Sequence, residues 1–290
     1  MHVYKESYDG IYEEQIVEQI LANKGGLVTG PAGTGKSVIL RTIMRKLATQ
    51  EQNIKVCAYT HAAARLVGGM TVSRLLHLDK SLHDAWILID EISLLPIDTI
   101  GALARLSLVG AKFICFGDFD GQFEAMKDRW DTPYSMVQGS EVIRDMCRGY
   151  HAHLTTNWRS KDSPELFDFY SSLYGKTDEE LPFAVQDAQA KFPLKVSPID
   201  VDIVLCVSHA KRIIINKRQN EAKAYKHEAE GGHTTHIEWT DDDIKGTTCQ
   251  PQSMIIWEGI ELIGCPRGTG NKRCGVVQGV IYRVTHIANK

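Results

Sequence analysis

Short apolar runs and helix-like apolar spacing alternate along the first half of the chain. The short runs, which predict buried strands, lie at residues 26–29, 54–59, 85–89, 112–116 and 153–156. The helical spacing, with apolar side chains three or four positions apart, occurs at residues 11–22, 38–44 and 97–109. Strands that alternate with helices are typical of a parallel sheet covered by helices. We therefore predict an α/β fold for this half.

The pattern becomes less regular after residue 160, and we predict a domain boundary there. The first domain would span residues 1–160 and the second residues 161–290. Helical spacing in the second domain occurs at residues 164–174 and 209–228. Apolar runs predict further strands at residues 201–207, 254–257, 261–263 and 280–287.

A phosphate-binding sequence lies between the first predicted strand and the helix that follows it. It reads G-x-x-x-x-G-K-S and consists of Gly30, Pro31, Ala32, Gly33, Thr34, Gly35, Lys36 and Ser37. Glycines let backbone N–H groups turn toward phosphate oxygens, and the helix N-terminus adds its positive dipole end. Lys36 can reach the β- and γ-phosphates, and the Ser37 hydroxyl can hold Mg²⁺. With both flanking elements in place, a chance glycine-rich turn is the weaker interpretation, and we expect ATP and Mg²⁺ to bind here.

Three later strands end in polar residues that suit the same chemistry. Asp90 can bind Mg²⁺ through water, and Glu91 can polarise the attacking water. Gln122 and Arg159, each after another strand, can sense the γ-phosphate. The alternatives are a solvated strand end, an ordinary loop and a surface ion pair. The ordered set, rather than any single residue, favours a catalytic role, because the carboxyl ends of parallel strands meet at one edge.

Composition limits the compartment and the partners. The chain has 290 residues, 43% of them hydrophobic, and a net charge of −3, so it is long enough for two domains but has no overall basic signal. A nucleic-acid surface must therefore be local. No apolar run approaches a membrane span, the N-terminus lacks signal-peptide features, and seven scattered cysteines predict reduced thiols. We expect an intracellular, reducing compartment, cytoplasmic or nuclear, and no membrane partner.

A zinc site is a weaker hypothesis for the second domain. Its candidate ligands are His233, His236, Cys249, Cys265 and Cys274. Their spacing contains no close C-x₂-C pair, which structural zinc sites usually have.

The order of the motifs resembles that of superfamily 1B helicases. This is the RecD-like group that includes the petite-integration-frequency DNA helicases and relatives in large DNA viruses and phages. The matching segments are the P-loop (motif I), residues 58–64 and 68–72 (motif Ia), 88–93 (motif II), 117–122 (motif III) and 154–160 (motif IV). Looser likenesses to the second RecA-like domain occur at residues 205–216 and 275–284.

The resemblance implies a P-loop NTPase with a RecA-like parallel sheet flanked by helices, followed by a partial second RecA-like domain. It implies ATP-driven, 5′-to-3′ translocation on single-stranded nucleic acid, with DNA favoured over RNA. Gln15 stands where the family's adenine-reading glutamine lies. Thr60, His61 and His209, at a strand end and a helix start, are the expected contacts to the nucleic-acid backbone, and Trp158 could stack on a base.

Three departures from the family pattern limit what carries over. Motif III usually has two residues between Asp and Gln, whereas three separate Asp118 from Gln122. The segment between Thr71 and Asp90 is short, so the strand-separating insertion must be minimal. The chain stops at Lys290, before motifs V and VI, the second of which supplies the family's arginine finger. The chain is then either a truncated piece of a longer, viral-like helicase or a natural product that lacks those motifs. In both cases we expect it to bind ATP, to hydrolyse it slowly with weak stimulation by single strands, and not to separate strands alone.

Two alternatives to a helicase stay open at this point. One is a P-loop ATPase that acts on protein partners, which nucleic-acid-stimulated hydrolysis would distinguish from a helicase. The other is a nucleotide-binding fragment without catalysis, which the missing motif VI arginine favours for the chain as it stands.

Overall fold

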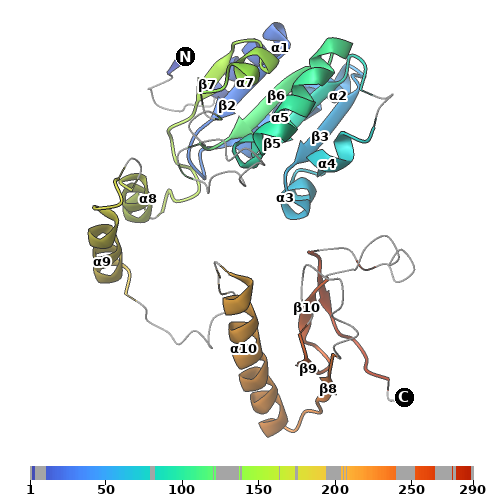
Figure 1. The fold of residues 1–290 in the computed structure, drawn as a ribbon, viewed down its shortest axis with the longest axis vertical. Coiled ribbons are helices and arrows are strands. Elements are labelled where there is room, and N and C mark those ends of the chain that lie inside the picture. The colour runs from blue at the N-terminus through green and yellow to red at the C-terminus, as the bar shows by residue number, and fades with distance from the viewer. Residues whose placement is uncertain are drawn as a thin grey trace. The chain divides into compact units, whose positions relative to one another are not determined.

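Two compact units make up the chain in the computed structural model, Met1–Ala184 and Val185–Lys290, and each is described by itself (Figure 1). The structure describes residues 2–3, 11–78, 82–119, 121, 137, 139–162, 164–173, 176–193, 204, 206, 208–239, 252–264, 276 and 279–288. The units divide after Ala184, and the domain boundary after residue 160 stays a prediction.

A seven-stranded sheet forms the centre of the first unit, and all its neighbouring strands are parallel. Its strands are β1 (His2–Val3), β2 (Gly26–Thr29), β3 (Ile54–Ala58), β4 (Met70–Thr71), β5 (Trp86–Asp90), β6 (Lys112–Gly117) and β7 (His151–His153). Their order across the sheet is β1-β7-β2-β6-β5-β3-β4. The predicted α/β parallel sheet is therefore confirmed. The adjacent strands β7, β2, β6 and β5 bring their carboxyl ends together at one edge, where such sheets bind ligands.

Helices and short turns connect these strands in the first unit. They are α1 (Ile11–Asn23), α2 (Lys36–Thr49), α3 (His61–Leu66), α4 (Val72–Leu75), η1 (Ile92–Leu94), α5 (Ile97–Ala104), η2 (Arg105–Val109), α7 (Glu141–Met146) and α8 (Pro164–Ser171). Helix α9 (Leu181–Lys191) crosses from the first unit into the second.

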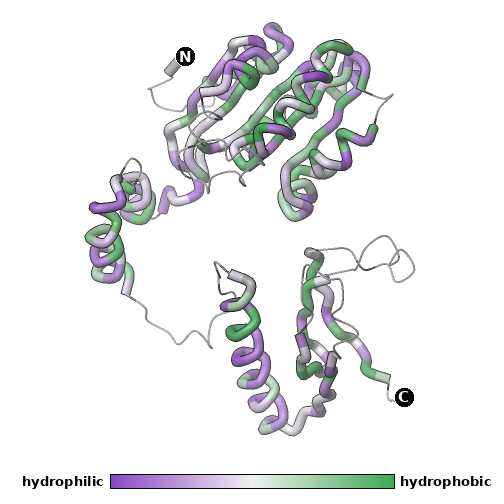
Figure 2. Tube along the Cα trace, viewed as in Figure 1, coloured by the Kyte–Doolittle hydropathy of each residue, from purple (hydrophilic) through white to green (hydrophobic). Residues whose placement is uncertain are grey.

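The core lies on both faces of the sheet, because successive strand residues point to opposite sides. On β5, Leu88 packs in the cluster that contains α1 and α2, whereas Ile87 and Ile89 pack in the cluster that contains α5 and α7. The strands at the centre of the sheet are accordingly strongly hydrophobic in Figure 2. Burial on both faces explains why the sequence shows continuous apolar runs here rather than alternation.

Several predicted elements differ in extent from the observed ones, as the strand predicted at residues 280–287 does, which is observed as Ile281–Arg283. The helix expected at residues 97–109 ends as an α-helix at Ala104 and continues as the 3₁₀ helix η2. The strand expected at residues 153–156 is β7 (His151–His153), because the chain leaves the sheet after Leu154 and turns toward the segment that follows β2. The two-residue strands β1 and β4 are too short to produce a periodic pattern, and the sequence analysis missed them.

The second unit contains one long helix and two antiparallel strand pairs among its described residues. They are α10 (His209–Ala229), β8 (Thr235–Ile237) with β9 (Met254–Ile256), and β10 (Glu261–Ile263) with β11 (Ile281–Arg283). Ser208 caps α10 by accepting a hydrogen bond from the Lys211 N–H at 3.2 Å. The strand predicted at residues 201–207 falls almost wholly outside the described residues. The β8 strand was not predicted.

None of the helices in the described ranges is long and apolar enough to cross a lipid bilayer.

Candidate functional site

The loop between β2 and α2 is tightly packed, and it requires glycine at two positions. Gly30 has a φ of 148°, and a Cβ there would lie 2.3 Å from the carbonyl oxygen of Leu154. Gly33 has a φ of 87°, and a Cβ there would lie 2.6 Å from Oδ1 of Asn157. Other residues avoid such backbone angles, and neither position has space for a side chain. The loop is therefore shaped to fit the segment that follows β7.

Lys36 begins α2 and turns its ammonium group back into this loop. The ammonium donates hydrogen bonds to the carbonyl oxygens of Gly30 and Pro31, the latter at 2.8 Å. Burial lowers the pKa of Lys36, and the carboxylates of Asp118 and Asp90 oppose this effect. A positive charge is thus held between the loop and two acidic strand ends.

Asp118 is a site residue to which the sequence analysis gave no role of its own. Its side chain is buried, and its Oδ1 accepts a hydrogen bond from the Gly121 N–H at 2.8 Å. It raises the pKa of Lys36 more than Asp90 does. The register of the sheet explains its position, because Thr29 pairs with Gly117, the residue before Asp118. A carboxylate directly after the strand next to the P-loop strand is the signal that would have identified it.

Asp90 and Glu91 follow one another at the end of β5. Burial raises the pKa of Asp90. Two smaller effects lower it, namely the hydrogen bond that the Glu91 N–H donates to Asp90 Oδ1 at 3.0 Å and the positive charge of Lys36. Burial also raises the pKa of Glu91, and the Asp90 carboxylate adds to the rise. Glu91 adopts the left-handed conformation (φ 57°, ψ 42°), which costs a non-glycine residue roughly 1–2 kcal/mol. Strained residues with raised pKa values are typical of functional sites, and a carboxylate of this kind is suited to accept a proton.

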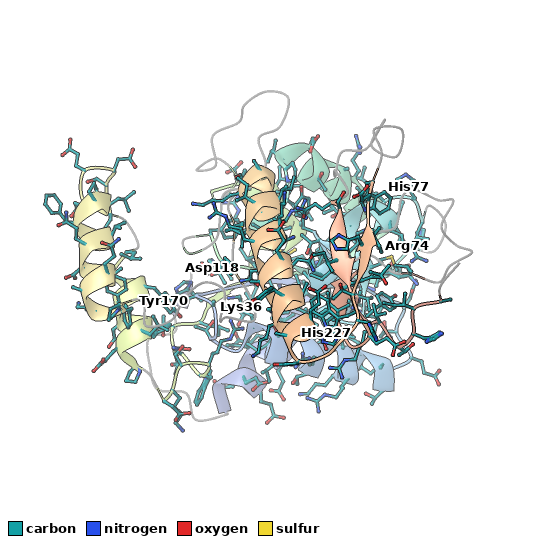
Figure 3. All side chains as sticks on the ribbon, turned by 90° about the horizontal axis from the view of Figure 1, so that it is seen from below. Lys36, Arg74, His77, Asp118, Tyr170 and His227 are labelled. Carbon is teal, nitrogen blue, oxygen red and sulfur yellow. The ribbon has the colours of Figure 1, made fainter. Side chains whose placement is uncertain are left out.

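A cleft of about 640 Å³ lies between the P-loop and the carboxylates of Asp90 and Glu91, and this volume is typical of small-molecule sites. Eight of the predicted phosphate-binding and catalytic residues line it, namely Ala32, Gly33, Gly35, Lys36, Ser37, Asp90, Glu91 and Arg159. Lys36 and Asp118 are labelled among the side chains of the first unit in Figure 3. The structure therefore brings together the predicted phosphate loop, the two predicted acids and the predicted arginine.

Backbone contacts place Arg159 at this cleft. The N–H groups of Trp158 and Arg159 donate to the Gly33 carbonyl oxygen at 2.8 and 3.4 Å. The Asn157 side chain accepts a hydrogen bond from the Ser160 N–H at 3.2 Å, which fixes the turn. The indole of Trp158 lines the same cleft and is 40% exposed. An exposed aromatic ring beside a phosphate-binding loop can stack on a flat ligand group.

Gln15 is not brought to the cleft, whereas Glu13 is. Gln15 is exposed on α1 and does not line the cleft, and Glu13 lines it. Residues two positions apart on an α-helix, such as Glu13 and Gln15, are separated by about 200° of rotation, so they cannot face the same side. The Glu13 carboxylate accepts a hydrogen bond from the Thr42 hydroxyl at 3.2 Å. Glu13 is a second cleft residue that sequence reasoning missed.

Several predicted residues lie outside the described part of the chain. They are Gln122 and, among the zinc candidates, Cys249, Cys265 and Cys274. Among the described residues, no group of three or more His, Cys, Asp and Glu side chains could hold a metal ion.

The predicted nucleic-acid contacts lie in both units. Thr60 follows β3 and caps α3, where its hydroxyl oxygen accepts the Ala63 N–H at 3.1 Å. Thr60 and His61 are exposed. They lie at the same sheet edge as Asp90, since Ala58 of β3 pairs with Asp90 of β5. His209 begins α10 in the second unit.

Curated proteins similar to this chain are DNA helicases. Over 140 residues the chain is 29% identical to the ATP-dependent DNA helicase RRM3 of Saccharomyces cerevisiae, which covers 37% of this chain and 19% of that protein. Over 136 residues it is 28% identical to the ATP-dependent RecD2 DNA helicase of Deinococcus radiodurans, which covers 41% of this chain and 19% of that protein. The matched part thus spans about a fifth of the length of these relatives.

Solved structures similar to the fold include two Pif1 structures. The Pif1 helicase from Candida albicans matches with a TM-score of 0.64 and 19% identity, over 97% of this chain and 69% of that one. Bacteroides Pif1 bound to ssDNA matches with a TM-score of 0.60 and 17% identity, over 98% of this chain and 71% of that one. Residues 13–181, more than half of the chain, match the family model AAA_30, described as an AAA domain. The chain therefore belongs to the AAA_30 family of P-loop proteins, and its matched relatives are ATP-dependent DNA helicases.

Proposed function

We propose that this chain is an ATP-dependent translocase of the helicase type that acts on single-stranded DNA in the 5′-to-3′ direction. One observation carries the proposal: the P-loop, the two acids at the end of β5 and Arg159 line a single cleft. Membership of the AAA_30 family and similarity to RRM3 and RecD2 support ATP-driven work on DNA.

The proposed roles follow from the position and charge of each residue. Lys36 and the N–H groups of its loop bind the phosphates, as the ammonium and the start of α2 both favour negative charge. Glu91, whose pKa is raised, orients the attacking water and accepts its proton. Arg159 supplies positive charge for the transferred phosphoryl group. The exposed face of Trp158 provides a surface for the nucleotide base.

The residues at the cleft also fit magnesium. Mg²⁺ prefers hydroxyl, carboxylate and water oxygens, and both Ser37 and Asp90 line the cleft. When bound to the phosphates, Mg²⁺ neutralises part of their charge. Asp118 accepts the Gly121 N–H and lies deeper, so we assign it to charge balance around Lys36 rather than to the metal.

Nucleic acid is proposed to contact the chain near Thr60 and His61 in the first unit and along α10 in the second. Both residues are exposed at the sheet edge that carries the cleft acids. Helix α10 carries Lys211, Lys217 and Arg218 on exposed positions, which suit phosphate contacts. We therefore expect the affinity for single strands to fall steeply with salt concentration.

The decisive experiment measures ATP hydrolysis with and without single-stranded DNA. The expected result is stimulation by DNA, a weaker response to RNA of equal length, and no hydrolysis by Glu91→Gln despite retained ATP binding. A duplex with a 5′ overhang, compared with one carrying a 3′ overhang, tests polarity when strand separation is measured with this chain and with a version extended past Lys290 to include motifs V and VI. Hydrolysis that single strands do not stimulate would instead support an ATPase that acts on protein partners. ATP binding without hydrolysis under all conditions would support a nucleotide-binding fragment.

A further inference from the structure

Tyr170 reaches the P-loop from α8, a helix for which the sequence suggested no function. Its hydroxyl donates a hydrogen bond to the carbonyl oxygen of Ala32 at 3.2 Å, across 138 positions of the chain. Tyr170 and Ala32 both belong to the first unit. Figure 3 labels Tyr170, which lies on α8, and Lys36, the first residue of α2. The contact is made on a residue that lines the nucleotide cleft.

The surroundings of Tyr170 keep its hydroxyl protonated, so that it can donate this hydrogen bond. The ring of Phe167, one helical turn earlier, packs against the Tyr170 ring edge to face, with centroids 5.0 Å apart and an interplanar angle of 81°. Burial raises the pKa of Tyr170, and the Asp118 carboxylate adds to the rise while Arg159 opposes it. The phenol therefore keeps its proton throughout the physiological pH range, so it can donate but does not become an anion beside the phosphate loop.

A hydrogen bond to the Ala32 carbonyl also determines the direction of the next backbone N–H, because both groups belong to one planar peptide. No described peptide bond is cis, and in a trans peptide the C=O and the following N–H point in opposite directions. A donor on the Ala32 carbonyl therefore fixes the direction of the Gly33 N–H. The next peptide is held in the same manner, since the N–H groups of Trp158 and Arg159 donate to the Gly33 carbonyl and so fix the N–H of Thr34. Successive N–H groups held in this way form an anion-binding nest.

We propose that Tyr170 is a positioning residue for the phosphate-binding nest that the N–H groups of Gly33 and Thr34 form. Its hydrogen bond to the Ala32 carbonyl fixes the direction of the Gly33 N–H. The inference rests on the proposed binding of nucleotide at the P-loop. Because Tyr170 acts through a backbone N–H, it should affect the binding of the polyphosphate part of the ligand and not the binding of the base. The fixed Gly33 N–H improves phosphate binding in the ground state, and the chemistry of hydrolysis is left to Glu91 and Arg159.

Tyr170→Phe removes only the hydroxyl and is the variant that tests the inference. With the 290-residue chain and Mg²⁺, titration calorimetry should show a loss of affinity of about threefold to fivefold for ATP and equally for inorganic tripolyphosphate. The loss is modest because 3.2 Å is long for an O–H···O bond. Tyr225→Phe, on an exposed tyrosine of α10, is the matched control and should leave both affinities unchanged. The KM for ATP should rise by the same factor while kcat stays constant.

A spectroscopic measurement separates positioning from a general structural effect. In the nucleotide-free chain, the amide nitrogen resonance of Gly33 should move in Tyr170→Phe, the amide of Gly35 should stay in place, and the thermal midpoint should not change. An unmoved Gly33 amide, an unchanged affinity, a loss confined to ATP, or a lowered thermal midpoint would each overturn the inference alone. Wild-type chain that binds neither ATP nor tripolyphosphate would overturn the proposed function and this inference with it.

Discussion

The two units differ in how they are held together. All the buried apolar side chains among the described residues belong to the first unit except Ala224 of α10. The described residues of the second unit are instead connected by polar side chains. The Asn220 amide pairs with the backbone of Ile255 in both directions, at 2.7 and 2.8 Å, and Gln252 donates to the Ile213 carbonyl at 2.9 Å.

Only the first unit has a rigid core that can hold catalytic side chains in fixed positions, as far as the described residues go. A rigid core on both faces of a sheet fixes the ends of its strands, and the cleft with Lys36, Asp90 and Glu91 lies at those ends. The long helix of the second unit is largely hydrophilic in Figure 2 and carries exposed basic residues, which suits contact with a charged partner rather than catalysis. We therefore expect catalysis to depend on the first unit and partner binding to involve both.

The largest expected effect is on the stability of the first unit. Ile87 lies fully buried in the centre of β5, so Ile87→Ala should lower the free energy of unfolding by about 2–5 kcal/mol. Ile263 in β10 is 65% exposed, and Ile263→Ala should change the free energy of unfolding by less than about 0.5 kcal/mol. Denaturant unfolding of both variants measures the contrast. Equal losses would show that the second unit has a core of comparable importance.

The next effect is on ATP binding. Lys36→Ala should weaken the binding of a labelled ATP analogue on the order of 100-fold, because the half-buried ammonium lies between the loop carbonyls and two acids. Lys46 lies on the same helix but pairs with Glu14 and does not line the cleft, so Lys46→Ala should bind the ATP analogue with unchanged affinity. An unchanged titration for Lys36→Ala would contradict the phosphate-binding assignment.

A smaller effect is expected from the polar contact that joins α10 to β9. Asn220→Ala leaves the Ile255 N–H and carbonyl without their side-chain partner, at a cost of about 1–3 kcal/mol. Hydrogen exchange should accelerate at the Ile255 amide and remain unchanged in β5. Asn216→Ala, which loses one bond to Gln252, should have a weaker effect. Faster exchange spread over the first unit would show that the two units are stabilised together.

The smallest effect on stability concerns Asp90 and depends on pH. Burial raises its pKa in the folded chain, so its contribution to stability is complete below the unfolded pKa and is lost as pH rises through the folded value. Asp90→Asn should therefore raise the thermal midpoint by a few degrees at pH 7 and hardly at all near pH 3, while hydrolysis is lost. Asp168→Asn, on an exposed aspartate, should shift the midpoint at neither pH. A lower midpoint for Asp90→Asn at pH 7 would show that the charged form is stabilising.

The local pattern of the sequence determined the architecture of the first unit. Continuous apolar runs before Gly30, Asp90 and Asp118 predicted buried parallel strands, because a strand covered on both faces needs apolar side chains on both. The glycines of the P-loop predicted a tight turn, because glycine adopts backbone angles that let successive N–H groups point toward a phosphate. The spacing of Lys36 and Ser37 after them predicted the phosphate-binding role. These features depend on neighbours in the chain, so they can be read without a structure.

Contacts between residues that are far apart in the sequence could not be predicted from its local pattern. The strand order β7-β2-β6-β5 places Asp118 close to Lys36, and Arg159 next to Gly33. The orientation of α1 directs Glu13, and not Gln15, toward the cleft. The contact of Tyr170 with Ala32 spans 138 positions and has no local signal at all. Sequence periodicity specifies which face of an element is buried, but contacts between elements depend on register and packing, which the folded core alone sets.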